Sequence, residues 1–291
     1  MEKDRVEGKE IMKKIVWLLL GISAAGAFGE EDVFSYKIGN IDVYMLVETA
    51  GPGNPRILLG VDEALRGRYL KPDFQSAVNV FLIKGPGGIV LVDTGFGGKI
   101  FDSMKSLGVK PGDVDVVLLT HMHGDHIGGL ARDGRALFPK ALVYVGEKEK
   151  EYWTVTNPNQ GVIAALAPYG NRVRTFRPGE LGGPPSRLAP GIEAVAAYGH
   201  TPGHSCFLIR SGDAQLLIFG DLVHVQDVQF PLPGVSVSYD VDPAMAAETR
   251  KRVLRYAAEH NIPVAGMHLV YPAIGGVNDN GEGGYVLIPA R

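Results

Sequence analysis

The sequence has little cysteine, no excess of positive charge and no long hydrophobic run. Its single cysteine, Cys206, excludes an intrachain disulfide, and its place in the apolar run "CFLIR" predicts a small core residue. Lys and Arg number 29 against 32 Asp and Glu, giving a net charge of -3. Without a basic excess or a run of Lys and Arg, no surface is predicted that could hold a nucleic acid backbone.

The N-terminus contains the one apolar segment that resembles a targeting signal. From Met12, two lysines precede the apolar run Ile15–Leu20, and Ala27-Phe28-Gly29 follows. This layout is typical of a secretory signal peptide, with a retained single-helix anchor as the alternative. The charged residues before Met12 fit no signal peptide, so Met12 is predicted to be the start and residues 1–29 an extension and signal. A periplasmic or secreted protein without a stable membrane anchor is expected.

From about Val33 the chain alternates short apolar runs with Gly and Pro, and no linker divides it after Glu30. It is therefore predicted to form one domain over 30–291. Strands are predicted at 34–40, 41–48, 78–85, 88–95, 114–120, 141–146, 192–199, 206–210, 215–221, 263–269 and 285–290. Helices are predicted at 99–108, 147–155, 161–170 and 242–260. Several strands are apolar throughout, so we expect two sheets face to face with helices outside, an αββα sandwich.

The helix at 242–260 has the clearest signals. Asp242 is a plausible N-cap, and Pro243 suits the first turn. An apolar stripe comes next, and the long side chain of Arg250 interrupts it.

A cluster of imidazole and carboxylate groups follows the predicted strand 114–120. The segment "HMHGDH" places His121, His123 and Asp125 on one side of an extended chain and His126 on the other. Neutral imidazole and carboxylate are ligands that zinc and similar divalent metals prefer. The alternative is a surface loop whose four polar residues bind no metal. Four such groups directly after a buried strand favour a metal site.

Three more residues of the same kind follow other predicted strands. His200 comes after 192–199, Asp221 ends the run "LLIFGD", and His268 lies in "PVAGMHL". Loops at strand ends are where functional groups concentrate. The repetition of one ligand-type residue at each of three strand ends indicates that they join the same site.

This set of residues resembles the metallo-β-lactamase superfamily, over nearly the whole chain after the signal segment. The resemblance implies that His121, His123 and His200 hold one divalent metal, that Asp125, His126 and His268 hold a second, and that Asp221 bridges both. It also implies supporting roles for Asp93 and His204 and an αββα fold. Zinc is the expected metal, with Fe, Mn or Co as alternatives.

The resemblance further implies a hydrolase in which the two metals share a bridging hydroxide, with Asp125 and Asp221 as the catalytic carboxylates. Two divalent ions, two carboxylates and a hydroxide leave one positive charge to stabilise an oxyanion. Asp221 argues against a true β-lactamase, and the chain looks most like the methyl parathion hydrolase and acyl-homoserine lactonase branch. A neutral ester, lactone or phosphotriester is the expected substrate. An iron-dependent redox or sulfur-handling member, or a metal-binding protein without turnover, are the alternatives.

The substrate contacts are predicted from residues near these ligands. His224 stands where such lactonases commonly carry Tyr, and it either contacts the substrate or packs beside the metals. Phe230 and Tyr271 are predicted to form an apolar pocket with the long segment 54–76. The alternative for this segment is that it packs on the core or against a second subunit in a homodimer.

Overall fold

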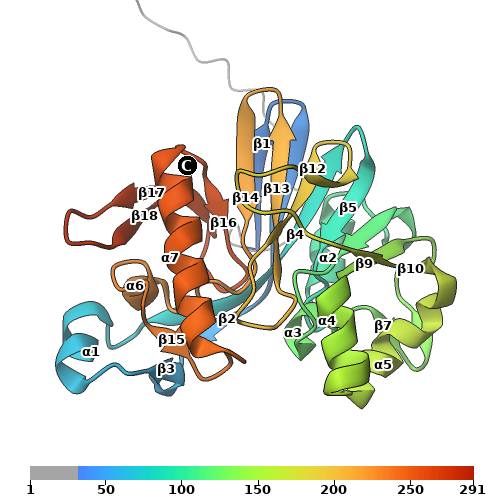
Figure 1. Ribbon diagram of the computed structural model, residues 1–291. Helices are drawn as coiled ribbons and strands as arrows, with labels where there is room; N and C mark the ends of the chain where they lie inside the picture. The colour runs from blue at the N-terminus through green and yellow to red at the C-terminus, as the bar shows by residue number, and fades with distance from the viewer. Residues whose placement is uncertain (1–31) are drawn as a thin grey trace, which may run out of the picture.

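The computed structural model describes residues 32–291, so the predicted signal peptide and the start at Met12 lie outside the described residues. Two seven-stranded sheets form the centre of this part of the chain (Figure 1). No helix within residues 32–291 has the length and apolar character needed to span a membrane.

The first sheet is antiparallel at one side and parallel at the other. Its order is β1 (Val33–Ile38), β2 (Ile41–Pro52), β4 (Gln75–Gly85), β5 (Gly88–Val92), β6 (Val116–Leu118), β9 (Leu142–Gly146) and β10 (Val173–Phe176). β5, β6, β9 and β10 run parallel. Parallel neighbours bring their carboxyl ends to the same sheet edge, which is where the segment from His121 begins.

The second sheet is mostly antiparallel, with one parallel pair between β14 and β16. Its order is β11 (Ser186–Ala189), β12 (Ile192–Ala196), β13 (Ser205–Ser211), β14 (Ala214–Ile218), β16 (Val264–Ala265), β17 (Ile274–Asp279) and β18 (Tyr285–Pro289). β10, β11 and β17 were not predicted. In β17 the pair Gly275-Gly276 interrupts the apolar pattern on which strand prediction depends.

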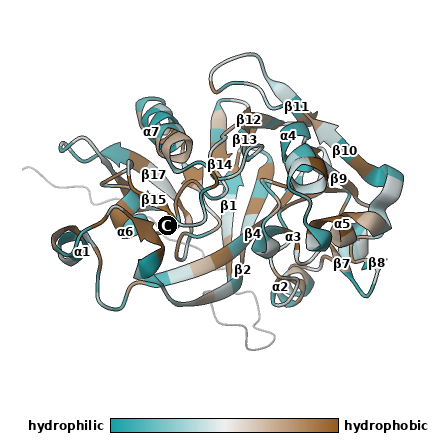
Figure 2. Ribbon diagram, turned by 60° about the horizontal axis from the view of Figure 1, so that its bottom comes forward, coloured by the Kyte–Doolittle hydropathy of each residue, from teal (hydrophilic) through white to brown (hydrophobic). Residues whose placement is uncertain are grey.

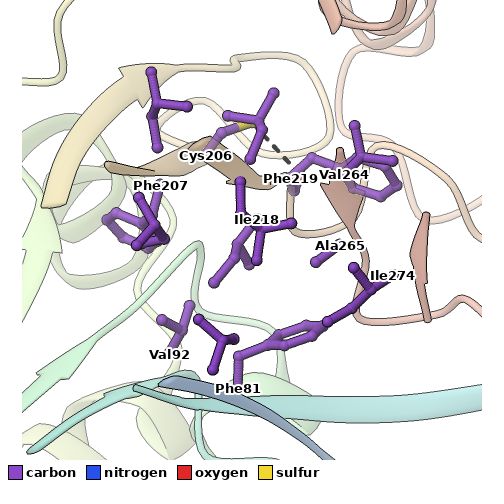
Figure 3. Packing of buried hydrophobic residues seen from close by; sticks show 14 of the residues in the cluster. Phe81, Val92, Cys206, Phe207, Ile218, Phe219, Val264, Ala265 and Ile274 are labelled. Atoms are coloured by element: carbon purple, nitrogen blue, oxygen red, sulfur yellow. Dashed lines mark hydrogen bonds between the residues drawn. The ribbon is translucent and has the colours of Figure 1, made fainter. Parts of the chain in front are cut away.

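The main core lies between the two sheets. Phe81 and Val92 of the first sheet pack toward Phe207, Ile218 and Ile274 of the second (Figure 3). Cys206 is fully buried in this layer, as its apolar run predicts. The continuous apolar strands are thus covered on both faces, and the predicted αββα sandwich is confirmed.

Helices cover the outer faces of both sheets. On the first sheet these are α2 (Ile100–Ser106), α4 (Glu147–Glu151) with a π-helical turn (Tyr152–Thr156), and α5 (Gln160–Leu166). α7 (Pro243–Glu259) covers the second sheet; the Asp242 side chain accepts from the Met245 backbone N–H, which confirms the predicted cap. Hydrophilic and hydrophobic residues alternate around α7, as Figure 2 shows, in keeping with one buried face.

The segment 54–76 folds as an arm over one end of the second sheet. It contains β3 (Leu58–Leu59), which pairs with β15 (Ser236–Val237), and α1 (Glu63–Tyr69), which was not predicted. Leu58 and Phe74 pack with residues beside α6 (Gln226–Gln229). Most of the arm's apolar residues therefore pack within the same chain. Packing on the core was the predicted alternative to a substrate pocket.

Candidate metal centre

The loop after β6 is held by a carboxylate from the neighbouring strand. Asp93 follows β5 with a φ of 60°, a left-handed conformation unusual for a residue other than glycine. Its buried carboxylate accepts hydrogen bonds from the Thr120 backbone N–H (2.8 Å), the Thr120 hydroxyl (2.6 Å) and His126 Nδ1 (2.7 Å). Because Nδ1 is the donor, Nε2 of His126 faces the site. Burial opposes a charge on this ring, but the carboxylates of Asp221 and Asp93 raise its pKa well above the ordinary value, so a cation at Nε2 would displace a proton.

Two further imidazoles are oriented in the same way. His200 Nδ1 donates to Asp240 Oδ1 at 2.8 Å, and His268 Nδ1 donates to the Ala77 carbonyl at 2.8 Å. Each hydrogen bond fixes the tautomer and turns Nε2 inward, the arrangement that metal-binding histidines commonly show.

The structure brings all seven predicted ligand residues together. One group comprises His121, His123, His200 and Asp221, and a second comprises Asp125, His126 and His268; within each group the donor atoms lie within 4.8 Å of one another. The Asp221 carboxylate lies between the groups. Toward the first group, its Oδ2 is 3.6 Å from His121 Nε2 and 3.4 Å from His200 Nε2. Toward the second group, the same Oδ2 is 3.0 Å from His268 Nε2, and Oδ1 is 3.2 Å from His126 Nε2.

The donor set fits divalent cations. Among residues 32–291, the buried atoms His126 Nε2 and Asp221 Oδ1 have no hydrogen-bond partner, although such atoms are costly to leave unpaired. His123 Nδ1 faces the Nε2 atoms of both His121 and His200 at 3.0 Å. Burial lowers the pKa of His123 to about 4 and that of His121 well below its usual range, so both rings are neutral, as ligands must be.

His224 lies against the same carboxylate. Its Nε2 is 3.2 Å from Asp221 Oδ2, and its ring stacks on His268 with 4.6 Å between centroids. Its buried Nδ1 has no partner in the described part of the chain. The side chain also lines a cavity over the metal centre. This position is compatible with both predicted roles of His224, contact with the substrate and packing beside the metals.

A cavity of about 530 Å³ opens over the centre. Its walls combine His123, Asp125, Asp221, His224 and His268 with residues from β2, β4, the arm and the loops after β6 and β15. These further residues are Pro52, Gly53, Asn54, Ile57, Ser76, Val78, Gly124 and Tyr239. No Lys or Arg is among these lining residues. The cavity therefore offers metal-ligand groups at its floor and largely uncharged walls above them.

Two predicted wall residues are placed elsewhere. Phe230 is 2% exposed, packs in the core between the sheets and lines a separate cavity together with Tyr69 of the arm. Tyr271 packs edge-on against Phe34, with 5.7 Å between ring centroids. Neither lines the cavity over the centre, so a contact of these two residues with the substrate stays a prediction.

Comparison with known proteins places the fold and the centre in a family. The sequence pattern of the Metallo-beta-lactamase superfamily matches residues 74–260, which include all seven ligand residues except His268. The chain belongs to the metallo-β-lactamase superfamily. The chain is 33% identical over 174 residues to the human metallo-beta-lactamase domain-containing protein 1. The match covers 57% of this chain and 54% of the human protein. The chain thus spans about half the length of that relative.

Other relatives match over more of their length. N-acyl homoserine lactonase AttM of Agrobacterium fabrum is 26% identical over 227 residues, covering 67% of this superfamily chain and 83% of AttM. Among solved structures, the hydrolase AbOPH superposes with a TM-score of 0.80 at 27% identity, over 89% of this chain and 98% of that one. The dizinc quorum-quenching lactonase AidC superposes with a TM-score of 0.79 at 22% identity, over 89% and 97%, and shows the same fold.

Three residues that hold the metal ligands or their loops in place were not predicted from the sequence to do so. Asp240 receives the hydrogen bond from His200 and also accepts from the Val237 backbone N–H at 3.0 Å. Arg250, fully buried on α7, has Nη2 3.7 Å from Asp240 Oδ2. Burial lowers the pKa of Arg250 to about 10, which still leaves it charged at neutral pH. An arginine in an apolar helix stripe was the available signal that a buried carboxylate lies nearby.

The third is Glu149 of α4, which joins the two histidine loops. Its carboxylate accepts from the backbone N–H groups of Met122 (2.9 Å) and Gly203 (3.0 Å), from the Thr201 hydroxyl (2.7 Å) and from Trp153 Nε1 (2.7 Å). Met122 lies between two ligand histidines, and Thr201 follows a third. In the sequence this residue is one of several charges in "EKEKE", where it gives no sign of being buried.

Proposed function

We propose that the protein is a dinuclear metal-dependent hydrolase of neutral esters, lactones or phosphotriesters, with zinc as the expected metal. The observation that carries the proposal is the position of Asp221, whose carboxylate lies within 3.6 Å of histidine nitrogens from both ligand groups. Divalent cations bound to these groups would polarise a substrate oxygen and lower the pKa of water to about 7.

The residues have distinct parts in this proposal. His121, His123 and His200 would hold one cation, Asp125, His126 and His268 the other, and Asp221 would hold both at a fixed separation. Asp125 also lines the cavity, with 22% of its side chain exposed, so its carboxylate can take a proton from an attacking water. His224 reaches the same space and would contact the substrate. Asp93, Asp240 and the Ala77 carbonyl keep the ligand rings in position.

The walls of the cavity support an uncharged substrate. The only charged side chains that line it are Asp125 and Asp221, both acidic. A carboxylate or phosphate dianion is usually held by Arg or Lys, and none is available there. The name of the relative AttM supports a lactone, and an aryl ester or a phosphotriester is likewise uncharged.

The test is a metal-quantified sample of the full chain assayed with N-hexanoyl-homoserine lactone, p-nitrophenyl acetate and diethyl p-nitrophenyl phosphate. We expect turnover of at least one of them and two metals per chain. Asp221→Ala should lose about two or more orders of magnitude in kcat/KM, while the exposed Asp213→Ala should retain activity. Metal content with no turnover of any substrate would favour a metal-binding protein without catalysis. Oxygen uptake by an iron-loaded sample would favour the redox alternative.

A further inference from the structure

A buried amide on the first sheet contacts the loop that carries His268. Asn79 lies in β4, and its side chain is on the same face as that of Phe81, which packs between the sheets (Figure 3). Asn79 is only 1% exposed. It is thus a polar residue on the apolar inner face of β4, directed toward the second sheet.

Asn79 makes three hydrogen bonds to the loop after β16. Its Nδ2 donates to the carbonyls of Leu269 (2.7 Å) and Gly266 (3.3 Å). Its backbone N–H donates to the Met267 carbonyl at 2.7 Å. Each partner is an acceptor, so the nitrogen of the side-chain amide has to face the loop. The bonded carbonyls lie on both sides of His268 in the sequence, so the contact fixes the backbone around that residue.

β4 extends beyond its neighbour β5, which leaves this part of its edge available to the loop. The pairing of β4 with β5 begins at Phe81, opposite Val92, so no residue of β5 lies opposite Asn79. The Met267 carbonyl accepts from the backbone there instead of a strand partner. Two residues earlier, the Ala77 carbonyl accepts from His268 Nδ1. Ala77 therefore orients the imidazole ring, and Asn79 holds the chain that carries it.

The amide oxygen of Asn79 indicates that the residue does more than stabilise the fold. Within residues 32–291, Oδ1 is buried without a hydrogen-bond partner, which lowers stability. An apolar side chain of similar size would avoid that cost, but it would leave the carbonyls of Gly266 and Leu269 without this donor. The benefit of an asparagine at this position is therefore the placement of the loop.

His268 is the one member of its ligand group that comes from the second sheet. Asp125 and His126 follow β6 of the first sheet, while His268 follows β16 of the second. His268 Nε2 lies 3.5 Å from Asp125 Oδ2 across this gap. In the other ligand group the second sheet supplies two members, His200 and Asp221, from other loops. A shift of the loop after β16 would therefore remove a ligand from one group and leave the other group intact.

Resting on the proposed function, we propose that Asn79 is a positioning residue for the second cation, the one that the group containing His268 would hold. Its hydrogen bonds hold the loop of the second sheet against β4, so His268 Nε2 stays beside the two ligands that the first sheet supplies. Asn79 is not a ligand in either group, and it acts on one of the two cations only.

The test is a stepwise zinc titration of the full metal-free chain in competition with a chromogenic chelator. The parent should bind two zinc ions. In Asn79→Leu the affinity for one ion should fall by at least about tenfold, while the affinity for the other changes by less than about threefold. Gln215→Leu is the matched control, because its amide oxygen is also buried without a partner in the described part of the chain. Gln215 lies near the start of β14, away from Asp221, so both zinc ions should bind as in the parent.

His268→Ala shows which ion is affected. This variant should weaken the same ion that Asn79→Leu weakens. Adding Asn79→Leu to it should cause no further loss in the affinity of either ion, because the ligand through which Asn79 acts is already absent. A general destabilisation of the fold would instead weaken both ions. The proposal is overturned if Asn79→Leu weakens both ions equally, weakens neither, or adds to the effect of His268→Ala.

Hydrogen–deuterium exchange of the metal-free proteins measures the loop itself. Exchange of the backbone amides of residues 266–270 should be faster in Asn79→Leu than in the parent, and Gln215→Leu should leave it unchanged. If Asn79→Leu does not fold, Asn79→Ala removes the same donor without added bulk and replaces it in each measurement. A parent that binds fewer than two zinc ions contradicts the proposed function and this inference together. Two zinc ions on the parent, with exchange and both affinities unchanged in the variant, overturn the inference alone.

Discussion

His204 Nε2 accepts a hydrogen bond of 3.0 Å from the backbone N–H of Asp221. Its Nδ1 donates to the Ala197 carbonyl at 3.0 Å, so this buried ring is neutral and joins the strand before His200 to the residue between the two ligand groups. Gly220 allows this contact: its φ is +63°, and a Cβ there would lie 2.5 Å from His204 Nε2. His204 thus positions Asp221 without belonging to either ligand group.

Replacing His204 should therefore destabilise the metal-free protein. His204→Leu leaves the buried N–H of Asp221 and the Ala197 carbonyl without their partner, a loss of about 1 to 3 kcal/mol in the free energy of unfolding. Urea denaturation of the metal-free chain measures this. His260→Leu, at the exposed end of α7, is the matched control and should change stability by less than about 0.5 kcal/mol. Equal stability of the two variants would contradict the positioning role.

The Asp240 carboxylate should strengthen metal binding through His200. Asp240→Asn keeps the shape of the side chain but removes the charge that makes the His200 ring a stronger donor, and we expect zinc affinity to fall by about 10- to 100-fold. A competition titration with a chromogenic chelator measures it. Asp242→Asn is the control two residues away, because Asn caps a helix about as well as Asp. The role is refuted if both variants bind zinc as the parent does.

Glu149 should matter more than its neighbours in the same charged run. Glu149→Gln places an amide where four donors converge, so at least one buried donor loses its acceptor, and stability should fall by about 1 to 3 kcal/mol. Glu151→Gln, exposed at the end of α4, should change stability by less than about 0.5 kcal/mol. Thermal unfolding of the metal-free proteins measures both changes. An equal loss of stability in the two variants would show that Glu149 does not hold the two histidine loops in place.

Metal binding should release protons and strengthen as pH rises. In the metal-free chain burial opposes a charge on His200, but its hydrogen bonds with Asp221 and Asp240 prevail and raise its pKa to about 9. Below that pH a proton occupies the nitrogen that a cation needs, so acid competes with metal. Calorimetric zinc titrations in buffers of different ionisation enthalpy should show proton release near pH 7. A zinc affinity that stays constant from about pH 6 to about 9 would exclude this competition.

The ligand residues could be predicted because each follows an apolar strand closely in the sequence. The spacing of His121, His123 and Asp125 encodes their common direction, and the separate strands carrying His200 and Asp221 end at one edge once the sheets pair. The supporting contacts could not be predicted in the same way. Asp240 meets its histidine across a gap of forty residues, which no local pattern shows.

The substrate walls were harder to predict for a related reason. Whether Phe230 points into a cavity or into the core depends on how the chain turns after α6, and both orientations bury an aromatic ring. The cavity that Trp153 lines depends likewise on how the loop after β6 packs against α5, which is a property of tertiary structure.

The most direct test of the central claim is anomalous diffraction at the zinc edge from crystals of the zinc-loaded protein. Two strong peaks are expected, one on each side of the Asp221 carboxylate, the first contacting His121, His123 and His200 and the second contacting Asp125, His126 and His268. A single peak that Asp221 does not contact, or no peak at the carboxyl ends of β6 and β14, would contradict a dinuclear centre.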